Sequence, residues 1–90
     1  MSIMDQLTIE SRIDTPRVFA DGNKGLFEIT GKSLPEDAFE FYKPLEKYVQ
    51  GYIKQPQPKT TINLKLEYLN SSSSKKLLDV IGYFEQLSKH

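Results

Sequence analysis

The fold of this 90-residue chain is decided by one stretch, TINLKLEYLNSSSSKKLLDVI, at residues 61–81. Its first part alternates apolar and polar residues, which is typical of a β-strand with one buried face. Four consecutive serines follow at residues 71–74, the serine tract, and after them apolar residues recur at helical spacing. A polar junction between a strand and a helix surrounds the first helical N–H groups, which lack partners inside the helix. Such a junction suits a phosphate group.

The stretch itself predicts one strand and one helix. The strand is expected over residues 60–69, and its apolar residues, which should share one buried face, are Ile62, Leu64, Leu66 and Tyr68. The helix is expected from Ser72 onward. Its apolar stripe consists of Leu77, Leu78, Ile81, Phe84 and Leu87.

A second helix is predicted upstream of this strand. Ser33 and Glu36 have the S-x-x-E spacing of a capping box, in which each side chain binds a free backbone N–H of the helix start. Apolar residues then recur at three- and four-residue spacing up to Tyr52; they are Ala38, Phe41, Leu45, Tyr48 and Tyr52. Pro44 lies inside this pattern and cannot donate a helical hydrogen bond, so it predicts a bend there.

The N-terminal third reads as strands. Residues 7–10 alternate, and residues 18–20 and 26–30 read as two strands of a hairpin around a glycine-containing turn at 21–25. Pro16 should mark the boundary before that hairpin. The predicted order is strand, strand, strand, helix, strand, helix, and the strands that flank the first helix should be parallel. This is an α/β fold with a small mixed β-sheet and two helices mainly on one face, formed by a single domain over residues 1–90.

Composition and charge exclude several classes of function. Twelve basic residues balance twelve acidic ones along the chain, which disfavours nucleic-acid binding. The N-terminal residues show no basic region followed by an apolar core, and no apolar run approaches the ~18 residues of a membrane span. The sequence therefore indicates a soluble cytoplasmic protein with neither nucleic acid nor membrane as a partner.

Catalysis and cofactor binding have no candidate residues. The chain has no cysteine, which excludes thiolate nucleophiles and cysteine-based zinc sites. Its one histidine, His90, is the last residue, a poor place for a metal ligand or general base because both need rigid support. Gly22 and Gly25 do not form a G-x-x-x-x-G-K-[ST] loop. We therefore expect no enzymatic activity, no metal and no cofactor.

The serine tract has two interpretations. Asn70 or Ser71 could simply cap the helix, with the other hydroxyls in a solvated turn. A cap needs only one side chain, however, whereas four serines offer a kinase several acceptors close to the positive end of the helix dipole. Lys75 and Lys76 add positive charge beside them.

Three motifs taken together resemble one bacterial family. They are GKSLPE at residues 31–36, FEFYKPL at 39–45, and LEYLNSSSSK at 66–75 followed by LLD at 77–79. In this combination they are similar to the SiaC-type regulatory phosphoproteins, which resemble the anti-sigma-factor antagonists. The resemblance covers the chain from residue 25 onward and implies a STAS-like fold.

The resemblance also implies partner switching. In that family a Ser/Thr kinase phosphorylates the hydroxyl that follows the asparagine, a PP2C-type phosphatase removes the phosphate, and one state binds an effector such as a diguanylate cyclase, linking the protein to cyclic-di-GMP and biofilm regulation. By position the acceptor here is Ser71, with Ser72 as the alternative because family members usually carry threonine. The implied partner-binding residues are Asn70, Ser71, Ser72, Ser73, Ser74 and Lys75.

Two other function classes remain open from the sequence. The same helix start could capture a small phosphate- or carboxylate-bearing ligand, or the chain could be a structural subunit whose serines only cap the helix. Family members usually continue through a further strand and helix. If that strand pairs beside residues 61–69, the open edge here predicts a homodimer or a strand-exchanged oligomer.

Overall fold

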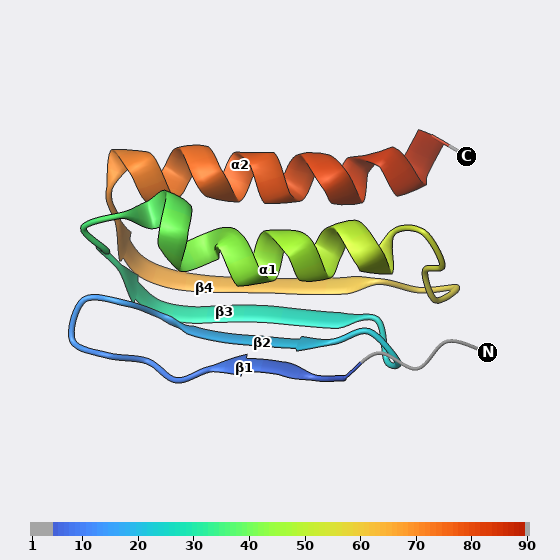
Figure 1. Cartoon of the computed structure of the whole chain (residues 1–90), viewed down its shortest axis with the longest axis horizontal. Coiled ribbons are helices and arrows are strands. Elements are labelled where there is room, and N and C mark those ends of the chain that lie inside the picture. The colour runs from blue at the N-terminus through green and yellow to red at the C-terminus, as the bar shows by residue number, and fades with distance from the viewer. Residues whose placement is uncertain (1–4, 90) are drawn as a thin grey trace.

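The strands and helices occur in the predicted order (Figure 1). The structure is a computed structural model that describes residues 5–89, so His90, the one histidine considered above, lies outside the described residues. The elements are β1 (Leu7–Ile9), β2 (Arg17–Asp21), β3 (Leu26–Ser33), α1 (Ala38–Tyr52), β4 (Thr61–Leu69), α2 (Ser71–Glu85) and a short 3-10 turn (Gln86–Lys89).

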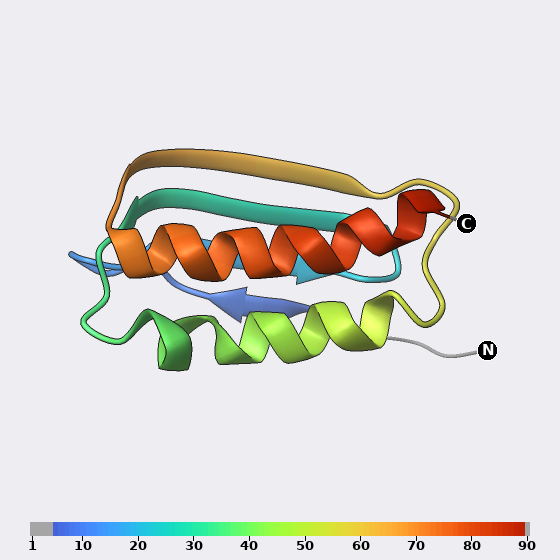
Figure 2. The ribbon, with the colours of Figure 1, turned by 90° about the horizontal axis from the view of Figure 1, so that it is seen from above.

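The four strands form one mixed sheet in the order β1-β2-β3-β4. Strand β2 pairs antiparallel with both β1 and β3. Strand β4 pairs parallel with β3 after the chain crosses through α1. Both helices lie side by side over the same face of the sheet, and their N-termini lie at the same end of the molecule (Figures 1 and 2). The predicted α/β fold is confirmed.

The core lies between the two helices and the central strands. Phe27 on β3 is its aromatic centre, because its ring contacts Tyr52 of α1 at 4.9 Å and Phe84 of α2 at 4.8 Å between centroids, both edge to face. The other buried apolar residues come from β2, β3, α1 and α2; they are Val18, Ala20, Ile29, Ala38, Tyr42, Leu45, Val49, Leu77 and Val80. Strand β4 contributes none of these fully buried side chains.

The predicted buried face of β4 is wrong in two respects. First, β4 is the edge strand of the sheet, so Ile62 and Leu64 stay 38% and 42% exposed. Second, a β-bulge interrupts the alternation: Gly31 pairs with Leu66, but the next residue of β3 pairs with Tyr68, which leaves Glu67 unpaired. The extra residue moves Tyr68 to the opposite face of the sheet, where it is 62% exposed.

The predicted capping box at the start of α1 is also wrong. The N-cap of α1 is Asp37, whose carboxylate accepts the backbone N–H of Glu40 at 3.1 Å. Ser33 instead ends β3, where it pairs with Leu69 and is completely buried. Its hydroxyl is engaged by side chains of the core and is not available to a helix N-terminus. A strand that continues three residues further than predicted thus takes the serine away from the helix.

Helix α1 continues through Pro44 to Tyr52 without interruption. Pro44 is exposed, so the carbonyl group that loses its helical partner at this point can be hydrated. The first turn of α1 is set slightly apart from the following turns in Figure 2. Over residues 5–89, no helix combines the length and the apolar character that crossing a bilayer requires.

Candidate functional site

The serine tract forms the first turn of α2, which begins at Ser71, one residue earlier than predicted. Asn70 is the N-cap: its Oδ1 accepts the backbone N–H of Ser73 at 2.9 Å and the hydroxyl of Ser72 at 3.3 Å. The interpretation in which Asn70 caps the helix is therefore confirmed. Because one side chain supplies this cap, the other hydroxyls of the tract are not needed for it.

Asn70 also connects α2 to the segment in front of α1. Its Nδ2 donates to the carbonyl oxygen of Pro35 at 3.1 Å, and its backbone N–H donates to the carbonyl oxygen of Ser33 at 3.0 Å. One asparagine thus holds together the end of β3, the entry to α1 and the start of α2. A chemical modification of the serine tract would therefore lie next to the starts of both helices.

Ser73 differs from its neighbours because it is completely buried. The hydroxyl of Ser33 donates to Ser73 Oγ at 2.8 Å, and Ser33 Oγ lies 2.5 Å from the hydroxyl of Tyr42. Since the single hydroxyl proton of Ser33 goes to Ser73, Tyr42 is the donor in the second bond. This chain of three hydroxyls ties β3, α1 and α2 together inside the core. Ser73 is therefore a structural residue and is inaccessible to a kinase.

Ser71 and Ser74 are exposed and line an open hollow beside the start of α2. Leu69, Asn70, Lys75 and Leu78 complete its lining. The only charged side chain among these residues is Lys75, and two of the others, Leu69 and Leu78, are apolar residues exposed by 43% and 66%. The hollow thus combines hydroxyls, one positive charge and an apolar border.

Ser72 faces a different environment on the other side of the helix start. The hollow on that side is lined by Glu36, Asp37, Ala38, Phe39, Ser72, Lys75, Lys76 and Asp79. Lys76 is already engaged: its Nζ lies 3.0 Å from Glu46 and 3.6 Å from Asp79, and the hydrogen bond to Glu46 raises the pKa of this lysine above 10.5. A phosphate on Ser72 would therefore face three carboxylates with Lys75 as the remaining cation.

The buried Tyr42 hydroxyl makes the stability of the protein sensitive to alkaline pH. Burial raises the pKa of Tyr42 above 10.0. In the unfolded chain the phenol ionises near pH 10, so above this pH the folded state binds more protons than the unfolded state. The free energy of unfolding therefore falls as pH rises, by at most about 1.4 kcal/mol per pH unit for this one proton. We expect a shallower fall in Tyr42→Phe, measured by urea unfolding between about pH 9 and 11. Equal slopes in the two proteins would contradict this assignment.

Loss of the Asn70 side chain should destabilise the protein without exposing its core. Asn70→Ala removes the cap of α2 and the bond to Pro35, and we expect a loss of about 2 kcal/mol in the free energy of unfolding. Asn70→Asp is the matched variant, since it keeps the cap acceptor but cannot donate to Pro35. Urea denaturation should place it between the wild type and Asn70→Ala. A cost for Asn70→Ala below about 0.5 kcal/mol would show that the contacts contribute little.

No cluster of three or more histidine, cysteine, aspartate or glutamate side chains that could hold a metal ion occurs within residues 5–89. The sequence missed two residues of the site, Ser33 and Tyr42. Tyr42 lies among the apolar residues of the predicted helix, and nothing in that pattern indicates a hydroxyl partner nine residues earlier in the chain, Ser33. Their roles depend on the tertiary packing of three elements.

Comparisons with known proteins agree on one family. A profile of the SiaC family of regulatory phosphoproteins matches residues 9–90. An uncharacterised protein of Pseudomonas aeruginosa strain UCBPP-PA14 is 29% identical over 83 residues; these cover 92% of this chain, which spans only 66% of that relative.

Solved structures give the same result. Apo-SiaC from Pseudomonas aeruginosa matches with a TM-score of 0.90 at 28% identity, covering 96% of this chain and 71% of SiaC. SiaC bound as activator to the diguanylate cyclase SiaD matches with a TM-score of 0.86, covering 92% of this chain and 68% of that one. On the profile match over most of its length, the chain belongs to the SiaC family of regulatory phosphoproteins.

Proposed function

We propose that this chain is a non-enzymatic signalling protein of a partner-switching circuit, in which reversible phosphorylation of Ser71 controls binding to an effector of the diguanylate cyclase class. Membership of a family of regulatory phosphoproteins supports the general role. The complex of the related SiaC with a diguanylate cyclase supports the class of effector. The exposure of Ser71 beside a buried Ser73 is the observation that supports the choice of acceptor.

The surroundings of Ser71 favour a phosphate there over one on Ser72. Ser71 is the first helical residue of α2, so a phosphate of about −1.5 to −2 charge on it would sit at the positive end of the helix dipole. The hollow beside Ser71 contains Lys75 and no carboxylate, whereas the hollow beside Ser72 contains three. The hydroxyl of Ser72 is in addition bound to the cap acceptor of Asn70.

The proposed partner surface is the start of α2 with its apolar border. It consists of Asn70, Ser71, Ser72, Ser74 and Lys75, together with the exposed Leu69 and Leu78. Ser73, which the sequence placed in this surface, acts in the proposal through the hydroxyl chain that positions the turn. A phosphate added at Ser71 would put two negative charges beside apolar contacts, enough to weaken or create an interface without refolding the domain.

The circuit requires a Ser/Thr kinase that adds the phosphate and a PP2C-type phosphatase that removes it. Neither would contact the buried Ser73. We place the chain in the cytoplasm, with these enzymes and the effector as its protein partners.

The test is site mapping by mass spectrometry on the protein isolated from its own cells. We expect one phosphate on Ser71, lost on phosphatase treatment and absent from a Ser71→Ala variant. Ser74→Ala is the matched control, because Ser74 lines the same hollow, and it should be phosphorylated normally. Phosphate found only on Ser72, or on no serine under several growth conditions, would contradict the choice of acceptor.

A binding measurement tests the switch itself. The affinity for the effector should differ by at least tenfold, about 1.4 kcal/mol, between unphosphorylated and stoichiometrically phosphorylated protein. The Ser71→Asp variant should shift in the same direction as the phosphorylated protein. Identical affinities for all three would reject the switch even if Ser71 carries phosphate.

A further inference from the structure

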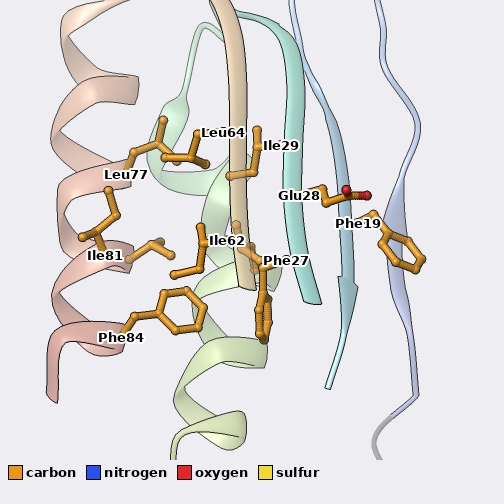
Figure 3. A pocket seen from close by; sticks show the side chains of 11 residues that line it. Phe19, Phe27, Glu28, Ile29, Ile62, Leu64, Leu77, Ile81 and Phe84 are labelled. Atoms are coloured by element: carbon orange, nitrogen blue, oxygen red, sulfur yellow. The ribbon is translucent and has the colours of Figure 1, made fainter. Parts of the chain in front are cut away.

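The face of the sheet opposite the two helices presents a group of cations that the proposed phosphorylation does not use. Side chains alternate between the two faces of a strand, so the burial of Val18 and Ile29 in the core places the neighbouring residues of β2 and β3 on the opposite face. We call this side of the sheet the far face. Phe19 and Glu28 belong to it, and their side chains extend away from α2 (Figure 3). Neither helix covers the far face (Figures 1 and 2).

Thr30 lies at the centre of this group of cations. Strand pairing places Arg17 of β2 directly opposite Thr30 on one side and Lys65 of β4 directly opposite it on the other. Neighbouring strands are only about 4.8 Å apart. Lys32 is the next far-face residue along β3, and all four side chains are exposed. We call Arg17, Lys32 and Lys65 the cationic patch.

The cationic patch is not neutralised by carboxylates of the described chain. Every ion pair within residues 5–89 involves Lys76, which lies on the helix side of the sheet. Glu10 follows β1 and Glu67 lies in the bulge of β4, and neither forms an ion pair with the patch. Glu28 shares the far face, but its Oε2 accepts a hydrogen bond from Asn63 at 3.1 Å. The patch therefore keeps a net positive charge.

Two aromatic rings hold two of these cations against the sheet. The Cζ atom of Arg17 lies 5.4 Å from the ring centroid of Phe19, and Nζ of Lys32 lies 5.8 Å from that of Tyr68. Tyr68 is the partner of Lys32 because the bulge shifts the register at this point. Side chains that are already restrained lose less conformational entropy when they bind an anion. The bulge thus helps to preorganise the patch.

We propose that the far face binds an extended acidic segment of a partner protein, whose carboxylates pair with the cationic patch. Charge complementarity supports this choice, because the patch is positive in a chain whose total charge is zero. In an extended segment, alternate side chains share one side and are about 6.8 Å apart. Diagonal neighbours on a sheet, such as Arg17 and Lys32, are about 7–8 Å apart. Carboxylates at alternate positions can therefore each meet one cation. The inference does not depend on the phosphorylation of Ser71.

A single strand of nucleic acid is the competing anion, and it fits the far face less well. Such strands are bound by grooves that combine several cations with free aromatic rings for base stacking. The patch has three cations beside Glu28. The rings of Phe19 and Tyr68 are each covered on one side by a cation, Arg17 and Lys32 respectively. The structure therefore favours carboxylates over bases and phosphates.

Chemical-shift mapping by NMR tests the site. A synthetic peptide of alternating glutamate and threonine is titrated into the isotopically labelled chain. We expect saturable shifts at Arg17, Thr30, Lys32 and Lys65, which should weaken as salt is added. The same peptide with glutamine in place of glutamate is the control and should cause no shifts. Shifts spread evenly over all the lysines, or no shifts at millimolar peptide, would overturn the proposal.

Neutral variants separate the patch from the other lysines of the chain. Lys32→Gln/Lys65→Gln should bind the peptide at least tenfold more weakly than the unmodified chain. Lys43→Gln/Lys47→Gln removes the same charge from the exposed surface of α1 and should bind normally. Far-UV circular dichroism checks that both variants are folded. Equal affinities for the two double variants would overturn the assignment to the patch. An oligothymidylate strand that binds the same residues more tightly than the peptide would overturn the choice of partner.

Discussion

Ser73→Asp is expected to unfold the protein, whereas Ser71→Asp, two residues earlier, should leave it folded. Position 73 is completely buried, and its Oγ accepts the proton of Ser33 inside the hydroxyl chain to Tyr42. An ionised carboxylate there would lose its hydration for one hydrogen bond, at a cost of several kcal/mol. Because domains of this size have a total stability of only about 5–15 kcal/mol, we expect a loss of about 4 kcal/mol or more.

Ser71→Asp is the matched control because the same negative charge enters the same helical turn. Residue 71 is exposed at the first helical position, where a carboxylate should stabilise α2 by about 0.3–1 kcal/mol. Thermal unfolding followed by circular dichroism measures both variants. Equal melting temperatures for Ser73→Asp and the wild type would show that the site of Ser73 tolerates a negative charge. Ser73 would then again be a candidate phosphate acceptor.

Gly25→Ala should be the most harmful glycine substitution within the described part of the chain. Gly25 has φ +66°, and a Cβ there would lie 2.4 Å from the carbonyl oxygen of Lys59. The backbone of Gly25 also accepts the N–H of Thr61, the bond that starts the β3–β4 ladder. Left-handed strain of about 1–2 kcal/mol adds to the cost of displacing a backbone segment, so we expect a loss of about 3 kcal/mol in the free energy of unfolding.

Gly82→Ala provides the opposite control. A Cβ at residue 82 meets no atom within 4 Å, and alanine favours the helix by about 1 kcal/mol over glycine. Urea denaturation should therefore show one variant less stable and the other more stable than the wild type. A loss below about 1 kcal/mol for Gly25→Ala would show that the loop around Lys59 moves at little cost.

The sequence predicted most of the fold because local patterns and topology agreed. The helical spacing that ends at Tyr52 and the hairpin around residues 21–25 depend on neighbouring residues, and their predictions are confirmed within a few residues. Two predictions were wrong where a distant element decided the outcome. The burial of β4 depends on what covers a sheet edge. The role of the Ser33 hydroxyl depends on hydrogen-bond partners that only the folded chain brings to it.

The candidate site was predictable to a similar extent. Its position at the start of α2 and its asparagine cap followed from the order of residue types, and family resemblance pointed to Ser71. The sequence did not indicate that one of the four serines is buried while the other three are exposed, because a run of identical residues carries no periodic signal. Ser73 becomes buried only when α2 packs on β3 and α1, and its partner Ser33 is 40 residues away in the chain.

The bulge in β4 determines which face of the sheet the side chains of the residues after Glu67 point to. One unpaired residue, Glu67, changes which side of the chain faces the helices, and so it determines that Asn70 reaches Pro35 while Ser71 reaches solvent. Glu67 itself is exposed and replaceable by other polar residues. The number of residues between Leu66 and Asn70 is not replaceable in this way. An insertion or deletion between Leu66 and Asn70 is therefore expected to be more harmful than a polar substitution of Glu67.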